Sequence, residues 1–297
     1  MSSQLHCHSY FSILDGYSSP EENLKQAAKL NLKALAITEH HELTSWLYYA
    51  ELKDKYPTVK QLYGIEAYEC EDREVQDPNN KYYHMIVIAR NEEGRKAINR
   101  ISTLGHLHGF YYKPRVTRYD VAKEGAENLI VLSACLASRL SRTKDYDTCL
   151  DMVKEYKELF PYYFLEIQAH DNEDQSEYNK KIMRLAKDTN TPVVVTNDVH
   201  AATKEDLYYQ DYFLRIAQDK ETASEIYGGC YMMSDDEIHN ILDKQIGYDA
   251  VCECLKNTDV VADLCEDVQM PWHEPELPKI DIPSGYTDSA EYLRELV

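Results

Sequence analysis

Short apolar runs alternate along the chain with longer segments in which apolar residues recur at helical spacing. Residues 33–38 (KALAIT) have the length and continuous hydrophobicity of a strand buried on both faces. The pair Ser19-Pro20 is typical of a helix start, with serine as cap and proline in the first turn. The alternation predicts an α/β fold in which helices cover a mainly parallel sheet. Strands are expected at residues 5–8, 33–38, 59–65, 85–89, 129–133, 163–168 and 192–196, and helices at 20–30, 43–55, 92–104, 146–159, 176–187, 204–217 and 246–264.

Two polar stretches interrupt this pattern. Residues 71–81 (EDREVQDPNNK) have the composition of a hairpin tip or surface loop. Residues 270–283 contain four prolines and predict an extended linker. A helical pattern then begins at Ser289 and stops without a cap, which predicts a longer parent polypeptide or a cut fragment. We therefore expect a main domain at residues 1–269, followed at 270–297 by a linker and the start of a helix.

Charge narrows the possible partners. The 297 residues carry a net charge of −20, and a protein that binds nucleic acid unaided usually shows a basic stripe. The balance favours a small substrate, a strand end, or a domain that works beside another protein. The eight cysteines lack a disulfide-framework spacing, and neither a signal peptide nor a membrane-spanning run is apparent. A cytoplasmic protein with reduced thiols is expected.

Metal-ligand residue types gather in four short segments that follow predicted strands. These are His6-x-His8, Asp15, the pair Glu39-His40 and the segment Asn197-Asp198-Val199-His200. Alternate residues of a strand share one face, so the two imidazoles of His6-x-His8 should point the same way. In α/β barrels the chemistry lies at the carboxyl ends of the strands, so all four segments should meet at one rim. Imidazole and carboxylate are ligands of Zn²⁺, Mn²⁺ and Fe²⁺.

Each segment also has an ordinary explanation when it is taken alone. His6-x-His8 could be a polar strand edge, Asp15-Gly16 a turn, and Asn197-Asp198 the cap of a following helix. His40 and His41 could be surface residues at a helix start. Burying so many acids and histidines at one rim would nevertheless be costly without a cation, which favours a shared metal site.

A longer series of motifs resembles a known family. The series contains Leu5-His6-x-His8-Ser9, Asp15-Gly16, Ala36-Ile37-Thr38-Glu39-His40, Tyr63-Gly64-Ile65-Glu66, His84-Met85, Gly109-Phe110-Tyr111-Tyr112-Lys113-Pro114-Arg115, Leu132-Ser133-Ala134-Cys135 and Thr196-Asn197-Asp198-Val199-His200. In this order, nearly end to end, the chain resembles the polymerase and histidinol phosphatase (PHP) domain of bacterial-type (C-family) DNA polymerase III alpha subunits. The resemblance implies a distorted TIM-like (β/α)7 barrel of the PHP type.

The resemblance also implies a ligand set. The family's nine metal ligands match His6, His8, Asp15, His40, Glu66, His84, Cys135, Asp198 and His200. None is missing, which favours retained metal binding over a purely architectural role. Glu39 stands where the family often has aspartate, and His41 where glycine is frequent, so the surroundings of the ligands are expected to differ. His84 begins its predicted strand, so its assignment rests on the resemblance.

The other candidates are weaker. His106-x-His108 is expected in a loop, and Cys252 and Cys254 as ordinary thiols of a helical segment. Lys113 and Arg115 could bind a phosphate, or could belong to a solvated loop. The clustered aspartates of a polymerase active site are not apparent in the sequence, so this chain should not polymerise DNA by itself.

Nine ligands exceed the needs of one ion, so two or three divalent ions (Zn²⁺, Mn²⁺ or Fe²⁺) are expected, with Glu66 and Asp198 as bridges. The predicted reaction is phosphoester hydrolysis, in which His8, Asp198 and His200 act through a metal-activated water and no separate general acid is assigned. By resemblance, the predicted activity is a 3′–5′ proofreading exonuclease. Its substrate would be a DNA 3′ end, and its partners the remainder of a polymerase III alpha polypeptide or other replication proteins. The alternatives are a small-molecule phosphatase or pyrophosphatase, and a metal-stabilised scaffold without turnover.

Overall fold

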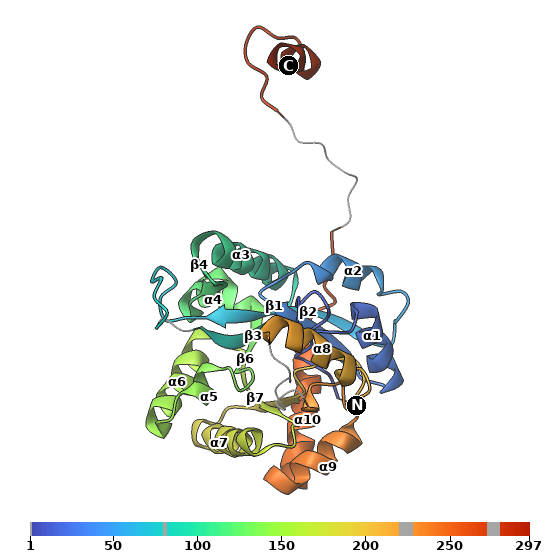
Figure 1. The fold of residues 1–297 in the computed structure, drawn as a ribbon. Coiled ribbons are helices and arrows are strands. Elements are labelled where there is room, and N and C mark those ends of the chain that lie inside the picture. Colours follow the sequence, from blue (N-terminus) through green and yellow to red (C-terminus); the bar gives the residue numbers. More distant parts are fainter. Residues whose placement is uncertain (1, 80–81, 220–227, 272–279) are drawn as a thin grey trace.

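The computed structural model describes residues 2–79, 82–219, 228–271 and 280–297. The wall of the fold is one curled sheet, in which successive strands form hydrogen bonds with one another (Figure 1). Around the curl the order is β1 (Ala34–His40), β2 (Lys60–Glu69), β3 (Tyr83–Ala89), β6 (Leu129–Leu132), β7 (Tyr163–Gln168) and β8 (Val193–Thr196). A small hairpin, β4 (Phe110–Tyr111) and β5 (Lys113–Val116), pairs with the end of β2.

The N-terminal segment closes the curl into a barrel. Gln4 bridges to Leu35 of β1, and Cys7 bridges to Val199, just beyond β8, both in parallel orientation. The backbone amide of His8 also donates to the carbonyl of Val199. The expected strand at residues 5–8 is therefore wrong as a regular strand, because these residues form only isolated bridges. They nevertheless occupy the place of a barrel strand, and the predicted TIM-like barrel is confirmed.

One strand runs against the others. β3 is antiparallel to both β2 and β6, whereas β1 with β2, and β6 with β7 and β8, pair in parallel. The 71–81 stretch connects β2 to β3, so the prediction of a hairpin tip is confirmed for residues 71–79, and residues 80–81 lie outside the described part. The reversal puts the start of β3 at the same rim as the ends of its neighbours.

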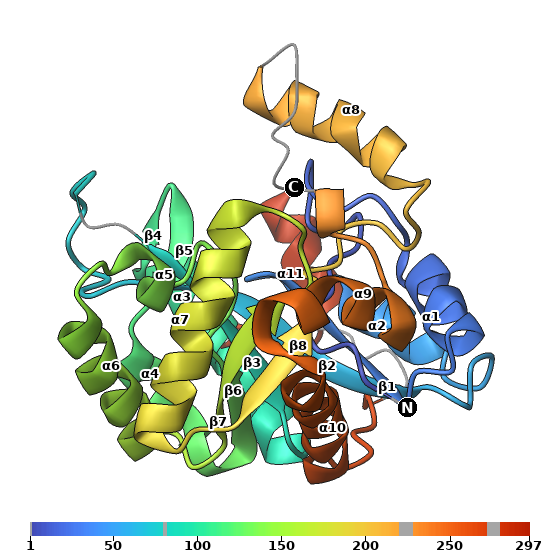
Figure 2. The same ribbon diagram turned by 90° about the horizontal axis from the view of Figure 1, so that it is seen from below.

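Most of the described helices cover the outside of the sheet, whereas the C-terminal helix α11 has no buried residue and stands apart from it (Figures 1 and 2). In chain order the helices are α1 (Pro20–Lys29), α2 (Ser45–Glu51), α3 (Glu92–His108), α4 (Arg118–Gly125), η1 (Ala126–Asn128), α5 (Arg139–Arg142), α6 (Tyr146–Leu159), α7 (Glu173–Thr189), α8 (Leu207–Gln218), α9 (Asp235–Ile246), α10 (Tyr248–Leu264) and α11 (Ser289–Leu296). The predicted start of α1 is confirmed, since the Ser19 side chain caps it and Pro20 stands in its first turn. None of the described helices is long and apolar enough to cross a membrane.

The expected helix at residues 246–264 is confirmed as α10, which begins two residues later, whereas α9 before it was not predicted. Gly247, with φ 90°, separates α9 from α10, a backbone conformation that glycine adopts without strain. The start of α9 carries a readable signal, because Ser234 and Glu237 form a capping box. In the linker predicted at 270–283, residues 272–279 lie outside the described part, and residues 280–283 are exposed and irregular. The division at residue 269 stays a prediction.

Candidate metal centre

Inward-facing side chains change character along the barrel. Ala36 of β1 and Leu62 of β2 belong to an apolar cluster, and four residues later on the same faces stand His40 and Glu66. Phe164 of β7 is likewise followed, two residues on, by Glu166. The barrel is therefore filled with apolar side chains at one end and with ionisable groups at the other, the end at which α/β barrels place their chemistry.

The reversed strand explains the position of His84. Because β3 is antiparallel to β2, His84 at the start of β3 pairs with Tyr68 near the end of β2. The imidazole thus reaches the same rim as Glu66, with Nδ1 2.7 Å from Oε1 of that carboxylate. The resemblance placed His84 at the site, and strand direction supplies the physical reason.

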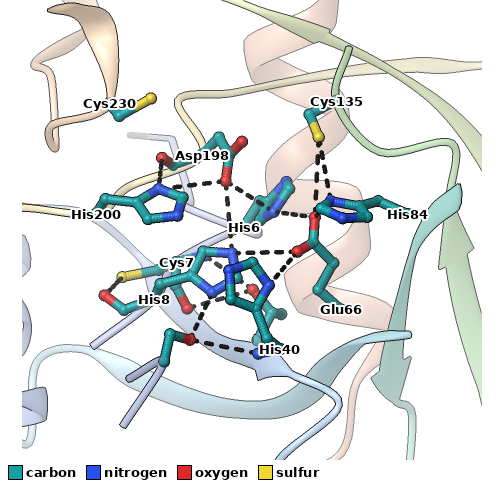
Figure 3. Close-up of polar contacts among 12 residues, drawn as sticks. His6, Cys7, His8, His40, Glu66, His84, Cys135, Asp198, His200 and Cys230 are labelled. Atoms are coloured by element: carbon teal, nitrogen blue, oxygen red, sulfur yellow. Dashed lines mark hydrogen bonds and ion pairs between the residues drawn. The ribbon is translucent and has the colours of Figure 1, made fainter. Parts of the chain in front are cut away.

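Glu66 lies at the middle of one half of the cluster (Figure 3). Besides His84, its carboxylate is approached by His40 Nδ1 at 2.6 Å, His6 Nε2 at 3.2 Å and Cys135 Sγ at 3.9 Å. Glu66 is buried, and burial alone would raise its pKa, but His84, His40 and His6 hold that pKa well below its usual range. An ionised carboxylate thus lies at the centre, with both oxygens directed at nitrogen or sulfur.

Asp198 lies at the centre of the other half (Figure 3). Its Oδ1 is 3.0 Å from His6 Nε2, 3.5 Å from His8 Nε2 and 3.6 Å from His200 Nδ1. Burial opposes ionisation, yet His6 and His200 hold the pKa of Asp198 well below its ordinary value. Asp15 completes the set, with Oδ2 2.8 Å from His40 Nε2. The structure therefore brings all nine predicted ligands together.

Outer contacts fix how two imidazoles face the cavity. His6 Nδ1 lies 2.8 Å from Glu166 Oε1, and an ionised carboxylate can only accept, so Nδ1 carries the proton and Nε2 faces the cluster. Ser12 donates its hydroxyl proton to Glu39, so its Oγ must accept from His8 Nδ1 at 2.9 Å. His8 therefore also presents Nε2 to the cavity. Such carboxylate–histidine contacts are the usual support of metal-binding imidazoles.

The donor atoms fit a metal cluster. Several buried atoms of the set make no hydrogen bond within the described residues, namely His6 Nε2, His8 Nε2, Asp15 Oδ1, His40 Nδ1, Glu66 Oε2 and Asp198 Oδ1. Some of these atoms lie at ion-pair distance from one another, as His40 Nδ1 and Glu66 Oε2 do, but none has a hydrogen bond in that part of the chain. A buried polar atom without a hydrogen bond costs about 1–3 kcal/mol. The separations of 3.0–3.7 Å between Nε2 of His6 and His8 and the two central carboxylates match two ligands on one ion at about 2.0–2.2 Å from each. Burial and the neighbouring imidazoles of His40 and His200 lower the pKa of His8 to about 3, which keeps it in the neutral, ligating form.

Several residues that matter here were not predicted. Glu166 was missed although a charged residue inside the apolar strand YFLEIQ is a visible signal. The side chains of Thr196 and Gln168 also donate to its Oε1, at 2.6 and 3.0 Å. Cys230 was missed because it follows no predicted strand. Its sulfur groups with Asp198 and His200 as a further possible ligand set.

Some sequence expectations were wrong. His106 and His108 lie in the last turn of α3, not in a loop. Arg115 is 1% exposed and donates to the carbonyls of Gly109, Arg73 and Val75, so it holds backbone and does not face a phosphate site. His41 is buried, not a surface residue.

His41 shows how this chain accommodates a departure from the family pattern. Its φ is 55°, in the left-handed region that favours glycine. A Cβ on Gly105 of α3 would lie 2.4 Å from His41 Nε2, so this glycine leaves room for the ring. The Asn197-Asp198 pair is not a helix cap either, because the next helix, α8, begins only at Leu207.

Comparison with known proteins agrees with this geometry. The profile of the PHP domain matches residues 4–170, and the chain belongs to the PHP domain family. It is similar to the DNA polymerase III subunit alpha of Treponema pallidum, at 31% identity over 99% of this chain and 26% of that protein. The corresponding subunit of Borreliella burgdorferi is 29% identical over 98% of this chain and 26% of that protein. The chain thus spans about a quarter of the length of these curated relatives.

Solved structures resemble the fold only distantly. A histidinol phosphate phosphatase from Lactococcus lactis, complexed with zinc, L-histidinol and phosphate, is 14% identical and covers 76% of this chain and 97% of its own, with a TM-score of 0.40. An amidohydrolase from Chromobacterium violaceum with bound sulfate is 13% identical, covering 68% of this chain and 88% of its own, with a TM-score of 0.42. Likenesses this low add nothing to the family assignment.

Proposed function

We propose that this chain is a metal-dependent phosphoesterase and that it acts as a 3′–5′ exonuclease on DNA ends. The observation that carries the proposal is the convergence of nine donor residues, seven of which line one cavity of about 280 Å³, with buried nitrogen and oxygen atoms that lack hydrogen bonds. Membership of the PHP family and similarity to DNA polymerase III alpha subunits support it.

The residues divide into groups that could each hold one ion. One group is His6, His8, Glu66 and Asp198, and a second is Glu66, His84 and Cys135. A third is His8, His40 and His200, with Asp15 beside it. Glu66 has two oxygens and could serve two groups, and Asp198 also belongs to a fourth group with His200 and Cys230. His8 offers one free nitrogen and could serve only one group at a time, so two or three ions fit the donor set. Histidine, carboxylate and thiol donors suit zinc, and the harder donors also suit manganese or iron.

When bound, such ions supply Lewis acidity toward a phosphate and a hydroxide nucleophile at neutral pH. The protein's own part is to hold the donor atoms in place. Glu166 and the Glu39–Ser12 pair fix His6 and His8, as derived above. We propose that His8, Asp198 and His200 carry the reaction through the activated water. None of these three is assigned as a separate general acid.

The exonuclease assignment rests on the relatives, and the charge of −20 limits it to an end of a strand. The size of the cavity favours one alternative, because about 280 Å³ also suits a small phosphate ester or pyrophosphate. A scaffold without turnover is disfavoured by the complete donor set. If the chain acts within a polymerase III alpha polypeptide, the remainder of that polypeptide would supply further contacts to DNA.

Elemental analysis and a nuclease assay test the proposal together. Purified protein should contain two or three divalent ions and, with Mn²⁺ or Zn²⁺, release nucleotides from single-stranded DNA labelled at the 3′ end. Asp198→Asn and His8→Ala should lose more than the roughly 10- to 100-fold typical for partners outside the ligand set. His239→Ala on α9 and Asp263→Asn, whose carboxylate is 69% exposed, are matched controls. Bound metal without hydrolysis of DNA, phosphomonoester or pyrophosphate would refute the enzyme and leave the scaffold.

A further inference from the structure

A second cavity opens beside the candidate metal centre. It has a volume of about 520 Å³ and shares His84, Ala137 and Arg142 with the metal cavity, so the two adjoin. Its remaining lining residues are Asp77, Pro78, Tyr82, Tyr83, Tyr111, Tyr112 and Arg115. The β2–β3 connection, the β4–β5 hairpin and α5, which supply most of this lining, lie on one side of the molecule in both views (Figures 1 and 2). We call this cavity the tyrosine cleft.

Tyr112 has a conformation that folding alone does not explain. It is the single residue between β4 and β5, its φ is 59°, and its side chain is 78% exposed. Left-handed backbone is unfavourable for a bulky side chain, and glycine would adopt it without strain. A large aromatic ring is thus held in solvent at the tip of a strained turn. Such strain is common at binding sites, where the side chain has another role.

Aromatic rings continue from Tyr112 toward the candidate ligands. Tyr111 and Tyr112 pack edge to face, with ring centroids 4.7 Å apart. Tyr82, which also lines the cleft, stacks on His84 with ring centroids 6.5 Å apart, and His84 lines both cavities. The cleft therefore offers flat apolar faces that end at a candidate ligand. Nucleobases stack on such faces regardless of sequence.

Positive charge accompanies the rings in an otherwise acidic protein. Arg142 lines both cavities, and among the described residues its guanidinium makes one hydrogen bond, from Nε to the carbonyl of Leu136. Lys113 is exposed and lies over the Tyr68 ring, with Nζ 5.2 Å from the centroid. Within the described part of the chain, neither cation has a carboxylate within ion-pair distance. Both charges are available to a phosphate backbone, whereas Asp77 adds one carboxylate to the far wall.

Hydrogen bonds of the Arg115 side chain connect two of the segments that line the cleft. The guanidinium donates to the carbonyls of Arg73 and Val75 in the β2–β3 connection, and to that of Gly109 just before β4. A Cβ on Gly109 would lie 1.9 Å from the Arg115 carbonyl oxygen, so only glycine permits this close approach. The β4–β5 hairpin that carries Tyr112 is thereby fixed to residues 73–75 of the β2–β3 connection.

We propose that the tyrosine cleft binds the unpaired nucleotides of a single-stranded nucleic acid whose scissile phosphate lies in the metal cavity. Bases stack on Tyr112 and Tyr82, and Arg142 binds a backbone phosphate at the junction of the two cavities. Stacking needs no large basic surface, which explains how a chain with a charge of −20 could hold a strand end. This assignment rests on the proposed phosphoesterase function and specifies its substrate.

The test measures binding separately from hydrolysis. The probe is a fluorescent oligothymidylate with phosphorothioate linkages, and its anisotropy is measured with the full chain. Tyr112→Ala and Tyr82→Ala should each weaken binding by about 5- to 100-fold, the range for loss of one stacked base. Tyr112→Trp should retain binding, and Tyr208→Ala, at a 63% exposed tyrosine on α8, should leave it unchanged. Arg142→Gln should reduce the slope of log affinity against log salt by about 0.7, the value for one phosphate contact on a single strand.

Tyr112→Gly guards against an effect of misfolding, because it should weaken binding while the thermal midpoint stays equal or rises. Unchanged oligothymidylate affinity in both tyrosine variants would overturn the cleft, and so would equal binding to a blunt duplex. Failure of the proposed function looks different. In that case the wild type hydrolyses no phosphate ester but still binds oligothymidylate through the tyrosines. If instead all variants hydrolyse thymidine 5′-p-nitrophenyl phosphate and none differs in oligothymidylate binding, the phosphoesterase stands and the cleft fails.

Discussion

The contact between Glu166 and His6 gives the sharpest prediction about the candidate metal centre. Glu166 is fully buried on β7 and lies 2.8 Å from His6 Nδ1, on the side of the imidazole that faces away from the other ligands. Glu166→Gln keeps the shape of the side chain and an acceptor oxygen but removes the charge. The ring of His6 should stay in place, while its Nε2 becomes a weaker donor.

The expected magnitude follows from that single contact. Partners of this kind typically contribute 10- to 100-fold to metal affinity, or about 1.4–2.8 kcal/mol. The metal-free protein should lose less stability than this, because Glu166 Oε2 is a buried oxygen without a hydrogen bond in the described structure, which offsets part of the attraction between the carboxylate and His6. The variant should therefore lose more metal affinity than stability.

The assay is competition for Zn²⁺ between the stripped protein and a chromophoric chelator, accompanied by urea unfolding in the absence of metal. Glu93→Gln, at a 65% exposed carboxylate on α3, is the matched control and should change neither quantity. Affinity within twofold of wild type would refute the idea that Glu166 tunes His6. A fall in metal-free stability as large as the loss of affinity would show that the residue only supports the fold.

Three further predictions concern stability. Gly105→Ala should lower the free energy of unfolding by about 1–3 kcal/mol, because the added Cβ would clash with the His41 ring. In a His41→Gly background the same substitution should cost nothing, and a double-mutant cycle measures the difference. Arg115→Met should lower the free energy of unfolding by about 2–3 kcal/mol, because the hydrogen bonds to backbone carbonyls are lost. Lys113→Met is the control and should change it by no more than about 0.5 kcal/mol. Equal changes for the two variants in urea unfolding would contradict the structure. Chelation should lower the thermal midpoint of metal-loaded protein, because ligand at 100 times its Kd adds about 2.7 kcal/mol; an unchanged midpoint would argue against bound ions.

Much of the fold was readable from local pattern. The runs at residues 33–38 and 163–168 became β1 and β7, and the Ser19-Pro20 pair marked the start of α1. These features depend on neighbours within a few residues, and side-chain spacing records them. The same spacing says which face of a strand is buried. It does not say which way the strand runs, and for that reason the position of His84 in the barrel could not be derived from the spacing.

The residues of the candidate site that would bind metal directly were mostly predicted from the sequence, whereas the residues around them were missed. His6-x-His8 and the Asp198–His200 segment stand out because their residue types are ligands and they follow apolar runs. Glu166 and Cys230 do not, since one lies inside a strand and the other follows none. Their roles depend on His6 and His200, which are distant in sequence and close in space.

Arg115 and Tyr112 show the same limit within one motif. The stretch of residues 109–115 suggested cations that could bind a phosphate. Only the packing shows that the Arg115 side chain donates to backbone carbonyls, whereas the Tyr112 side chain is exposed to solvent. The sequence alone determined the alternation of elements, the inward faces and most of the donor residues, because these follow from short-range periodicity. Strand direction, barrel closure by residues 4–8 and the partners of each imidazole were decided by tertiary structure, because they depend on contacts between segments far apart along the chain.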